Sequence, residues 1–269
     1  MSGFTAEWLT LREPHDLAAR NRAVLDAVTT SFKSAGSMHV VDLACGAGST
    51  VRALHAHLPV RQHWDLVDND TDLLALACSR NRDNGITLKA VHLDLSRDVE
   101  AALGGSVNLI TISALLDLVS CKWLDQFLHK IAARRLPVYA ALTYDGRTSL
   151  SPADPFDGHI LSAVNAHQLT DKGFGPALGP TAASSAITGL RALGYRVVDG
   201  ESDWILRPDD REFQNEMLEG WANAAREMGT QSDAEIADWL ARRKIMISEG
   251  LSSMQVGHVD FFAFPSSTR

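Results

Sequence analysis

Residues 40–48, with the sequence VVDLACGAG, constrain the fold of this chain more than any other segment. The apolar run predicts a short buried strand that ends in an acid, and the glycines predict a tight turn. Glycine has no Cβ, so the backbone N–H groups of such a turn can approach a nucleotide closely. Residues 49–58 predict a helix, whose positive N-terminal end faces the same ligand. This order of strand, turn and helix indicates a nucleotide-binding α/β unit.

Two acids beside the turn narrow the choice of ligand. Asp42 lies directly before the turn, where a carboxylate repels the pyrophosphate of a dinucleotide and attracts the ammonium group of S-adenosylmethionine. Asp68 ends a second strand-like run, where an acid accepts hydrogen bonds from both ribose hydroxyls of an adenosine. The dinucleotide pattern G-x-G-x-x-G asks for a third small residue, and Val51 stands there instead. These residues favour a cationic adenosyl ligand.

At these positions the chain resembles the class I S-adenosylmethionine-dependent methyltransferases, over roughly residues 38–145. The first motif of that family is D/E-x-G-x-G-x-G after a hydrophobic run. Here the motif reads DLACGAG over residues 42–48, with Ala44 in place of the first glycine. The resemblance implies that S-adenosylmethionine is the cofactor and S-adenosylhomocysteine the product.

Three further motifs follow in the family order. The second matches at Asp68, the third at residues 91–95 with Asp94 as its acid, and the fourth loosely at residues 108–113. In the family the third-motif acid lies near the adenine amino group. All these segments end predicted strands, so we expect them to meet at one edge of a sheet. The expected cofactor contacts are Arg20, Asp42, Ala44, Cys45, Gly46, Asp68, Asn69, Asp94, Leu95 and Ser113.

The first 36 residues predict helical structure that covers the cofactor as a lid. Pro14 fits the first turn of a helix, and apolar residues recur at helical spacing over residues 17–32. Arg12 and Arg20 are candidates to bind the methionine carboxylate of the cofactor, because guanidinium pairs with carboxylate bidentately. An ordinary ion pair is the alternative for each, and Arg20 is the favoured candidate.

From residue 38 onward, strand-like and helix-like segments alternate. This rhythm predicts a parallel sheet with helices on both faces. Five strands are expected at 38–44, 63–68, 86–93, 107–113 and 136–143, and two more at 195–199 and 256–264. In the resembling family the last strand runs antiparallel. The fold class is therefore α/β: a Rossmann-like, doubly wound, seven-stranded, mostly parallel sheet with an antiparallel last strand.

Two segments depart from the family pattern. Residues 144–180 are rich in Gly, Pro, Asp and His, which predicts a long substrate loop above the cofactor edge. Residues 207–252 carry two helical patterns where the family has a short connection, and they form either a wall of the substrate pocket or a dimer surface. We therefore divide the chain into a lid, 1–36, and a methyltransferase domain, 37–269, with both insertions.

The 144–180 segment supplies the candidates for the acceptor site. A methyl group leaves sulfur by in-line attack, and a base helps when the acceptor is a hydroxyl or an ammonium group. His167 is the expected catalytic base, because imidazole titrates near neutral pH, and a structural hydrogen bond is the alternative. No metal is expected, since Asp117 and Asp145 lack the contexts of metal-dependent methyltransferases. Substrate contacts are expected from Tyr144, Asp145, His159, Asp171, Lys172 and Phe174.

Composition limits the partners. The net charge of −8, from 25 basic and 33 acidic residues, disfavours a nucleic acid, because phosphate binding requires a basic surface. The chain shows neither a signal-peptide pattern nor an apolar run approaching the roughly 18 residues of a membrane span. Its three cysteines have no framework spacing, which indicates a reducing compartment. We expect a cytoplasmic protein without a membrane partner, and a homodimer is one possible assembly.

The lead hypothesis is an S-adenosylmethionine-dependent methyltransferase that acts on an oxygen, nitrogen or carboxyl of a small molecule. The acidic charge and the long 144–180 segment motivate a small acceptor, although a protein or RNA acceptor stays open. The first alternative is a non-catalytic S-adenosylmethionine-binding interaction protein that uses 207–252 as its surface. The second is an NAD(P)-dependent oxidoreductase. Turnover on an acceptor screen tests the first alternative, and titration with a dinucleotide tests the second.

Overall fold

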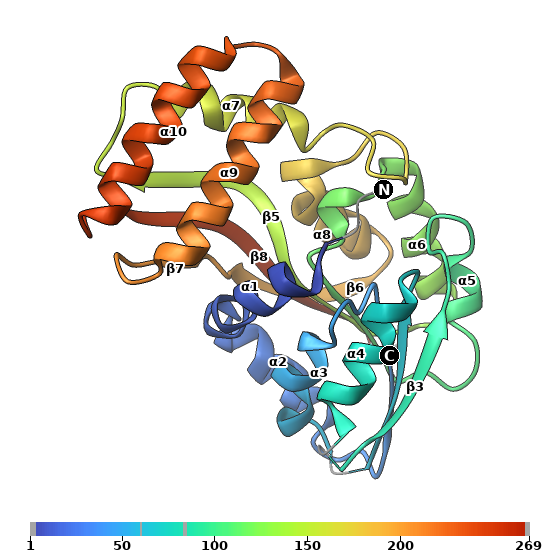
Figure 1. The fold of residues 1–269 in the computed structure, drawn as a ribbon. Coiled ribbons are helices and arrows are strands. Elements are labelled where there is room, and N and C mark those ends of the chain that lie inside the picture. The colour runs from blue at the N-terminus through green and yellow to red at the C-terminus, as the bar shows by residue number, and fades with distance from the viewer. Residues whose placement is uncertain (1–3, 60, 83–84, 267–269) are drawn as a thin grey trace.

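A twisted sheet forms the centre of the computed structural model, which describes residues 4–59, 61–82 and 85–266 (Figure 1). The sheet has the order β3-β2-β1-β4-β5-β8-β6, and a short strand, β7, pairs with β8. Strands β1 to β5 pair in parallel, and β8 runs antiparallel to β5, β6 and β7. The strands are β1 (Met38–Leu43), β2 (Gln62–Asp68), β3 (Thr87–His92), β4 (Leu109–Ser113), β5 (Val138–Ser151), β6 (Tyr195–Glu201), β7 (Trp204–Leu206) and β8 (Ser253–Pro265). The predicted Rossmann-like sheet is confirmed, with eight strands instead of seven because β7 was not foreseen.

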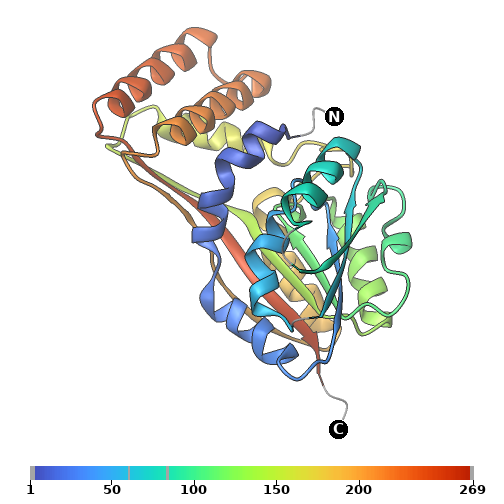
Figure 2. The same cartoon turned by 60° about the horizontal axis from the view of Figure 1, so that its bottom comes forward.

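Helices cover both faces of this sheet (Figure 2). Successive strand residues point to opposite faces, so Val40 and Leu109 pack with α2, α3 and α4, while Val41 and Ile110 pack with α5, α6 and α8. The helices are α1 (Ala6–Ala19), α2 (Arg22–Phe32), α3 (Ser49–Leu54), α4 (Thr71–Arg80), α5 (Val99–Ala102), α6 (Cys121–Ala133), α7 (Asp157–His167), α8 (Ala182–Ala192), α9 (Arg211–Met228) and α10 (Asp233–Ser248). Short 3-10 turns add η1 (His55–His57), η3 (Leu116–Leu118) and η4 (Gly179–Thr181). None of the helices in the described ranges combines the length and the apolar character that a membrane crossing requires.

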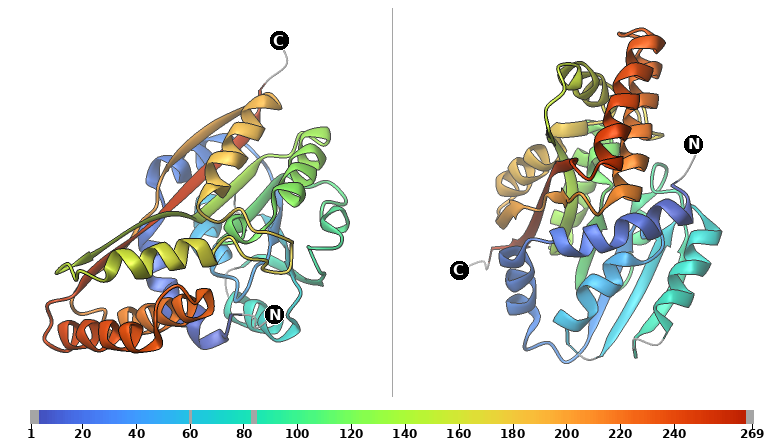
Figure 3. Two further views of the ribbon diagram at one scale, coloured as in Figure 1. Left: turned by 90° about the horizontal axis from the view of Figure 1, so that it is seen from above. Right: turned by 60° about the vertical axis from the view of Figure 1, so that its left-hand side comes forward.

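Strands β5 and β8 extend far beyond the rest of the sheet and carry a second layer of helices (Figures 1 and 3). Their outer halves stay paired, from Thr148 opposite Val256 to Ser151 opposite Ser253. We call the outer halves of β5 and β8, together with β7, α7, α9 and α10, the cap. The cap has its own hydrophobic cluster, centred on large side chains such as Phe213. The two helices predicted within 207–252 are confirmed as α9 and α10.

The prediction of a long loop over 144–180 is wrong for most of its length. Residues 144–151 continue β5, and residues 157–167 form α7, which packs against α9. The outer half of β5 alternates more and less exposed residues, so its apolar content is too dilute to reveal a strand. Residues 152–156 between β5 and α7 and residues 168–178 between α7 and η4 remain irregular.

The N-terminal segment is helical as predicted, but it forms two helices. Thr5 caps α1 by accepting a hydrogen bond from the Trp8 N–H at 3.2 Å. Pro14 therefore lies inside α1 and not in its first turn, which corrects the prediction. The helical conformation is interrupted at Arg20 and Asn21, and the Asn21 side chain caps α2. Figure 3 shows α1 passing between the sheet and the cap.

Candidate functional site

The turn after β1 has the backbone that its glycines predict. Ala44, Gly46 and Gly48 have φ values of 53°, 51° and 76°. The Gly46 N–H donates to Asp68 Oδ2 at 2.8 Å, which ties the turn to the end of β2. A Cβ on Gly48 would lie 2.6 Å from the side-chain nitrogen of Asn81. Gly48 is therefore required both by its left-handed backbone and by packing against α4.

Strained backbone gathers at the carboxyl ends of the parallel strands. Ala44 follows β1, Ala114 follows β4 and Leu142 lies within β5, all with φ between 52° and 54°. Such a conformation costs a residue with a side chain roughly 1–2 kcal/mol. Asp260 on β8 helps to hold it, because its Oδ1 accepts from the Leu142 N–H at 2.8 Å. Among the described residues only Arg135 shares this strain away from that edge, and strain of this kind clusters at functional sites.

Asp42 is a buried acid with one free oxygen. Its Oδ1 accepts a hydrogen bond from Thr111 Oγ1 at 2.7 Å, whereas Oδ2 has no partner among the described residues. Burial raises the pKa of Asp42 to about 7, although the Thr111 hydrogen bond, the charge of Arg20 and the nearby Thr50 hydroxyl act in the opposite direction. This carboxyl is therefore suited to bind a cationic group, whose charge favours the ionised form.

Arg20 lies at the break between α1 and α2 and is 6% exposed. Its Nη2 donates to Ser113 Oγ at 3.2 Å and its Nη1 to the Tyr139 hydroxyl at 3.4 Å, while Nε has no partner among the described residues. Asp260 Oδ2 accepts from the Asn21 N–H at 2.9 Å and so fixes the break. The structure thus places a guanidinium group and a carboxyl, Arg20 and Asp42, near each other at the carboxyl edge of the sheet.

The remaining predicted cofactor residues lie along the same edge with different surroundings. Asp68 is 8% exposed and also accepts from the Asp70 N–H at 3.0 Å, and burial raises its pKa against these hydrogen bonds. Cys45 and Leu95 are buried, and Asn69 is exposed. Asp94 is more open, with 40% of its side chain exposed, and accepts two hydrogen bonds from Ser96.

The predicted catalytic base lies in the cap. His167 ends α7, and its Nε2 lies 2.9 Å from a carboxylate oxygen of Glu227 on α9. Its Nδ1 lies 3.3 Å from the Lys172 ammonium nitrogen. Both ring nitrogens thus face side chains of opposite charge, and the histidine links α7 to α9. Its role in catalysis stays a prediction.

The structure does not gather the predicted substrate residues into one group. Asp145 accepts from Arg147, and Asp171 accepts from the backbone N–H groups of its own turn. Phe174 packs edge-on against Trp123 with ring centroids 5.5 Å apart. His159 is exposed, and its ring lies beside the Phe156 ring in a tilted arrangement. Each of these four residues therefore has a structural contact of its own.

Tyr144 is the predicted substrate residue that the structure does place beside further polar groups. It is buried where β5 leaves the sheet, and its hydroxyl donates to Asn165 at 2.8 Å. The rings of His258 and Trp204 lie beside it, with centroid distances of 6.0 Å from Tyr144 to His258 and 4.5 Å from His258 to Trp204. His258 was missed because only the pairing of β8 with β5 brings it here, and no local motif marks it.

Two buried groups from other elements lie close to these rings. Arg12 on α1 holds its guanidinium carbon 5.4 Å from the centre of the Trp204 ring. Asp117 in η3 is 6% exposed, and its Oδ1 has no partner among the described residues. Its position four residues after the end of β4 was visible in the sequence, but its burial was not.

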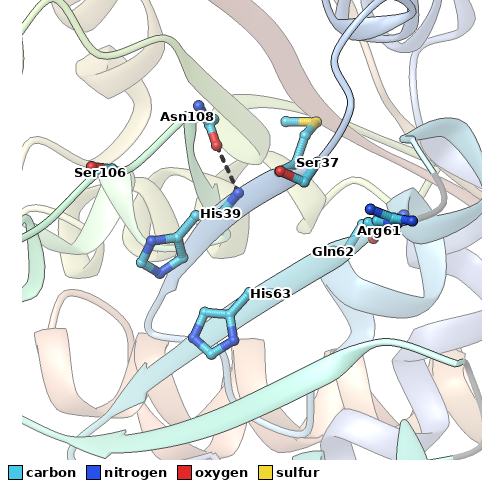
Figure 4. Close-up of a pocket in the computed structure, with 8 residues that line it drawn as sticks. Ser37, His39, Arg61, Gln62, His63, Ser106 and Asn108 are labelled. Atoms are coloured by element: carbon cyan, nitrogen blue, oxygen red, sulfur yellow. Dashed lines mark hydrogen bonds between the residues drawn. The ribbon is translucent and has the colours of Figure 1, made fainter.

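A group of potential metal ligands lies at the opposite, amino-terminal edge of the sheet, beside the hollow in Figure 4. His39 and His63 are register partners on β1 and β2. The Nε2 atoms of the two rings lie 3.1 and 3.0 Å from the two carboxylate oxygens of Asp65. The Lys89 ammonium also lies 3.9 Å from Asp65 and supplies a competing positive charge. The turn after β1 lies at the other end of these strands, so this group takes no part in the site.

Comparison with known proteins identifies the class. Residues 40–136 match the family model of a methyltransferase domain. This segment contains the glycine-rich turn and the buried acids that end β1 and β2. The match is consistent with the class I S-adenosylmethionine-dependent methyltransferases. The protein is accordingly a methyltransferase, and S-adenosylmethionine is its methyl donor.

Solved structures share the fold over nearly the whole chain. A cyclopropane-fatty-acyl-phospholipid synthase-like protein from Lactobacillus casei is 12% identical with a TM-score of 0.57, covering 97% of this chain and 95% of its own. The cyclopropane synthase MmaA2 from Mycobacterium tuberculosis is 11% identical with a TM-score of 0.50, covering 97% and 94%. At this identity the likeness concerns the fold alone. No curated protein sequence matches the chain.

Proposed function

We propose that this protein transfers the methyl group of S-adenosylmethionine to a small-molecule acceptor, with the residues under α1 as its cofactor site. The observation that carries this proposal is a set of buried polar atoms at the carboxyl edge of the sheet. Arg20 Nε and Asp42 Oδ2 are buried without a described partner, and such atoms cost free energy unless a ligand contacts them. Their opposite charges match the two charges of a methionine group.

The chemistry of each residue supports its place in this site. Arg20 binds the methionine carboxylate of the cofactor, and Asp42 Oδ2 accepts from its ammonium group. Asp68 accepts from the ribose hydroxyls, as acids at the end of the second strand do in nucleotide-binding α/β folds. Asp94 and Leu95 flank the adenine, and the turn residues Ala44, Cys45 and Gly46, together with Asn69 and Ser113, line the remaining edge. In this position α1 excludes water from the reacting centre.

A small acceptor fits the charge of the protein. The net charge of −8 opposes a polyanionic acceptor, and the cap stands beside the carboxyl edge where an acceptor must approach. In this proposal the helices of 207–252, α9 and α10, form a wall of the substrate pocket. The match to a methyltransferase domain weighs against the oxidoreductase alternative, and measured turnover separates an enzyme from a protein that only binds the cofactor.

Replacing Asp68 tests the cofactor site directly. S-adenosylhomocysteine at 100 times its Kd should stabilise the native protein by about 2.7 kcal/mol, which a thermal shift assay detects as a rise of several degrees. Asp68→Ala should lose most of this shift, because the ribose and the Gly46 N–H both lose their acceptor. Asp125→Ala on the exposed side of α6 is the matched control and should keep it. An undiminished shift in Asp68→Ala contradicts the proposed role.

Cofactor binding should depend on pH through Asp42. The folded-state pKa of this acid is raised to about 7, so its carboxyl is protonated below pH 7 and ionised above it. Because the ligand ammonium pairs with the ionised form, affinity is highest above pH 7. Between pH 8 and pH 6 the Kd of S-adenosylhomocysteine should rise about tenfold. Isothermal titration calorimetry at both values checks this, and equal affinity at both would contradict the role of Asp42.

A further inference from the structure

Asp117 is a buried acid that cofactor binding does not use. It lies in η3, four residues beyond Ser113, which ends β4 and contacts Arg20. The segment between them contains the strained residue Ala114. Only a few residues therefore separate Ser113, which contacts Arg20 of the proposed methionine site, from Asp117. Its Oδ1 has no partner among the described residues although it is buried.

The groups that face Asp117 come from two other elements. Arg12 of α1 and Tyr144 of β5 both interact with it electrostatically. Burial raises the pKa of Asp117 to about 6, against the positive charge of Arg12. At pH 7 the carboxylate is therefore mostly ionised and still basic enough to take a proton.

Arg12 is held in place by partners other than Asp117. Its Nε donates to Asp16 Oδ2 at 2.9 Å, and Asp16 Oδ1 accepts from the Trp204 Nε1–H at 3.0 Å. Arg12 and Asp16 are 8% and 2% exposed. The positive charge of this guanidinium acts on Asp117, while Asp117 Oδ1 accepts no hydrogen bond from any described residue and is left for a ligand.

His258 also lies in this region, but it does not compete with Asp117 for a proton. Its Nδ1 lies 3.0 Å from the Val256 carbonyl, which can only accept, so Nδ1 carries the hydrogen and Nε2 a lone pair. Burial lowers the pKa of His258 to about 3. This imidazole stays neutral at physiological pH and presents a hydrogen-bond acceptor beside Trp204.

We infer that Asp117 is the general base of the reaction and that the acceptor is a hydroxyl or amine, not a carboxylate. In the transfer step the acceptor lone pair bonds to the methyl carbon, the electron pair of the broken C–S bond stays on sulfur, and the acceptor proton passes to Asp117 Oδ1. A carboxylate acceptor has no proton to give and is repelled by Asp117. Arg12 acts as a positioning residue that tunes the carboxylate. This inference rests on the proposed function.

Sinefungin provides a probe that does not require the acceptor to be known. In this analogue a carbon bearing an amino group replaces the methyl-bearing sulfur, so a cation occupies the place of the transferred methyl. If Asp117 faces that place, sinefungin should bind about tenfold or more tightly than S-adenosylhomocysteine, as expected for a buried charge-assisted hydrogen bond. Both ligands share the amino-acid end, so the contribution of Asp42 cancels in the ratio of the two Kd values.

Calorimetry on the native protein and on Asp117→Asn gives the decisive comparison. The Kd of S-adenosylhomocysteine divided by the Kd of sinefungin should fall to about one in Asp117→Asn. It should remain unchanged in the matched control Asp125→Asn. Should Asp117→Asn fail to fold, the native protein alone gives a second measurement, because the preference should grow as pH rises through about 6. A preference that is absent, or that persists in Asp117→Asn, or that ignores pH, overturns the inference. Absence of S-adenosylhomocysteine binding to the native protein would instead overturn the proposed cofactor site.

Arg12→Gln separates positioning from simple structural support. Removal of the nearby positive charge should raise the pKa of Asp117, so the pH midpoint of the sinefungin preference should move upward. A merely structural role for Arg12 would weaken binding of both ligands and leave that midpoint in place.

Discussion

Asp42→Asn should stabilise the unliganded protein and at the same time abolish tight cofactor binding. In the folded state the pKa of Asp42 is raised from 3.8 to about 7, so the ionised carboxyl opposes folding. This cost begins above pH 3.8, grows to pH 7 and is constant beyond it. Asparagine keeps an oxygen for Thr111 but carries no charge. At pH 8 we expect the free energy of unfolding to rise by roughly 2–4 kcal/mol, measured by denaturant unfolding.

The same substitution should weaken S-adenosylhomocysteine binding by about 30-fold or more, because a charge-assisted hydrogen bond to the ligand ammonium is lost. Binding should also lose its dependence on pH between 6 and 8. The gain in stability should shrink as pH falls below 7, since the native acid then becomes neutral as well. A variant that is less stable than the native protein at pH 8 would contradict the electrostatic argument.

Gly48→Ala should be among the most destabilising substitutions of a single methyl group in this chain. The backbone at Gly48 has φ of 76°, and a Cβ would lie 2.6 Å from the Asn81 side-chain nitrogen and 3.0 Å from the Ala77 Cβ. Backbone strain and overpacking each cost about 1–3 kcal/mol, so the free energy of unfolding should fall by about 3 kcal/mol. Urea denaturation measures the loss.

Gly36→Ala is the matched control, because nothing lies within 4 Å of its added Cβ and its φ is outside the left-handed region. It should change the free energy of unfolding by less than about 1 kcal/mol. Equal effects of the two substitutions would show that the turn after β1 relaxes more easily than its contacts indicate.

Local patterns predicted the nucleotide-binding half of the fold well. The apolar run at 40–43 and the glycines at 46 and 48 act through neighbours in sequence, so strand, turn and helix could be placed from the sequence. The ends of β2 and β4 followed from the same alternation, which is why Asp68 and Ser113 were assigned to the correct edge.

The cap could not be predicted in this way, because its structure depends on pairing between distant segments. Residues 144–151 form a strand only because β8 lies beside them. Their glycine and their charged residues, such as Asp145 and Arg147, resemble a loop when neighbouring strands are unknown. In α7 the polar and apolar residues follow no clear helical stripe, so its packing on α9 left little signal in the sequence.

The residues that we propose beside the acceptor were likewise only partly predictable from the sequence. Asp117 follows a predicted strand, yet its burial results from the packing of η3 against β5, η4 and α8. His258 lies on the inner part of β8, more than a hundred residues further along the chain. Sequence reasoning therefore favoured polar residues near the fifth strand, such as His167, considered Asp117 only as a metal ligand, and did not single out His258.

The continuity of β5 and β8 determines which part of the protein can admit the ligands. Both strands run from the sheet into the cap, with register shifts in their pairing between Ala140 and Thr148, and no loop separates the two parts. Helix α1, by contrast, is attached by side-chain contacts such as those of Glu13 with Arg52 and of Thr10 with Arg80. Cofactor entry and product exit would therefore require α1 to move, which breaks these contacts together with the buried hydrogen bond between Trp204 and Asp16.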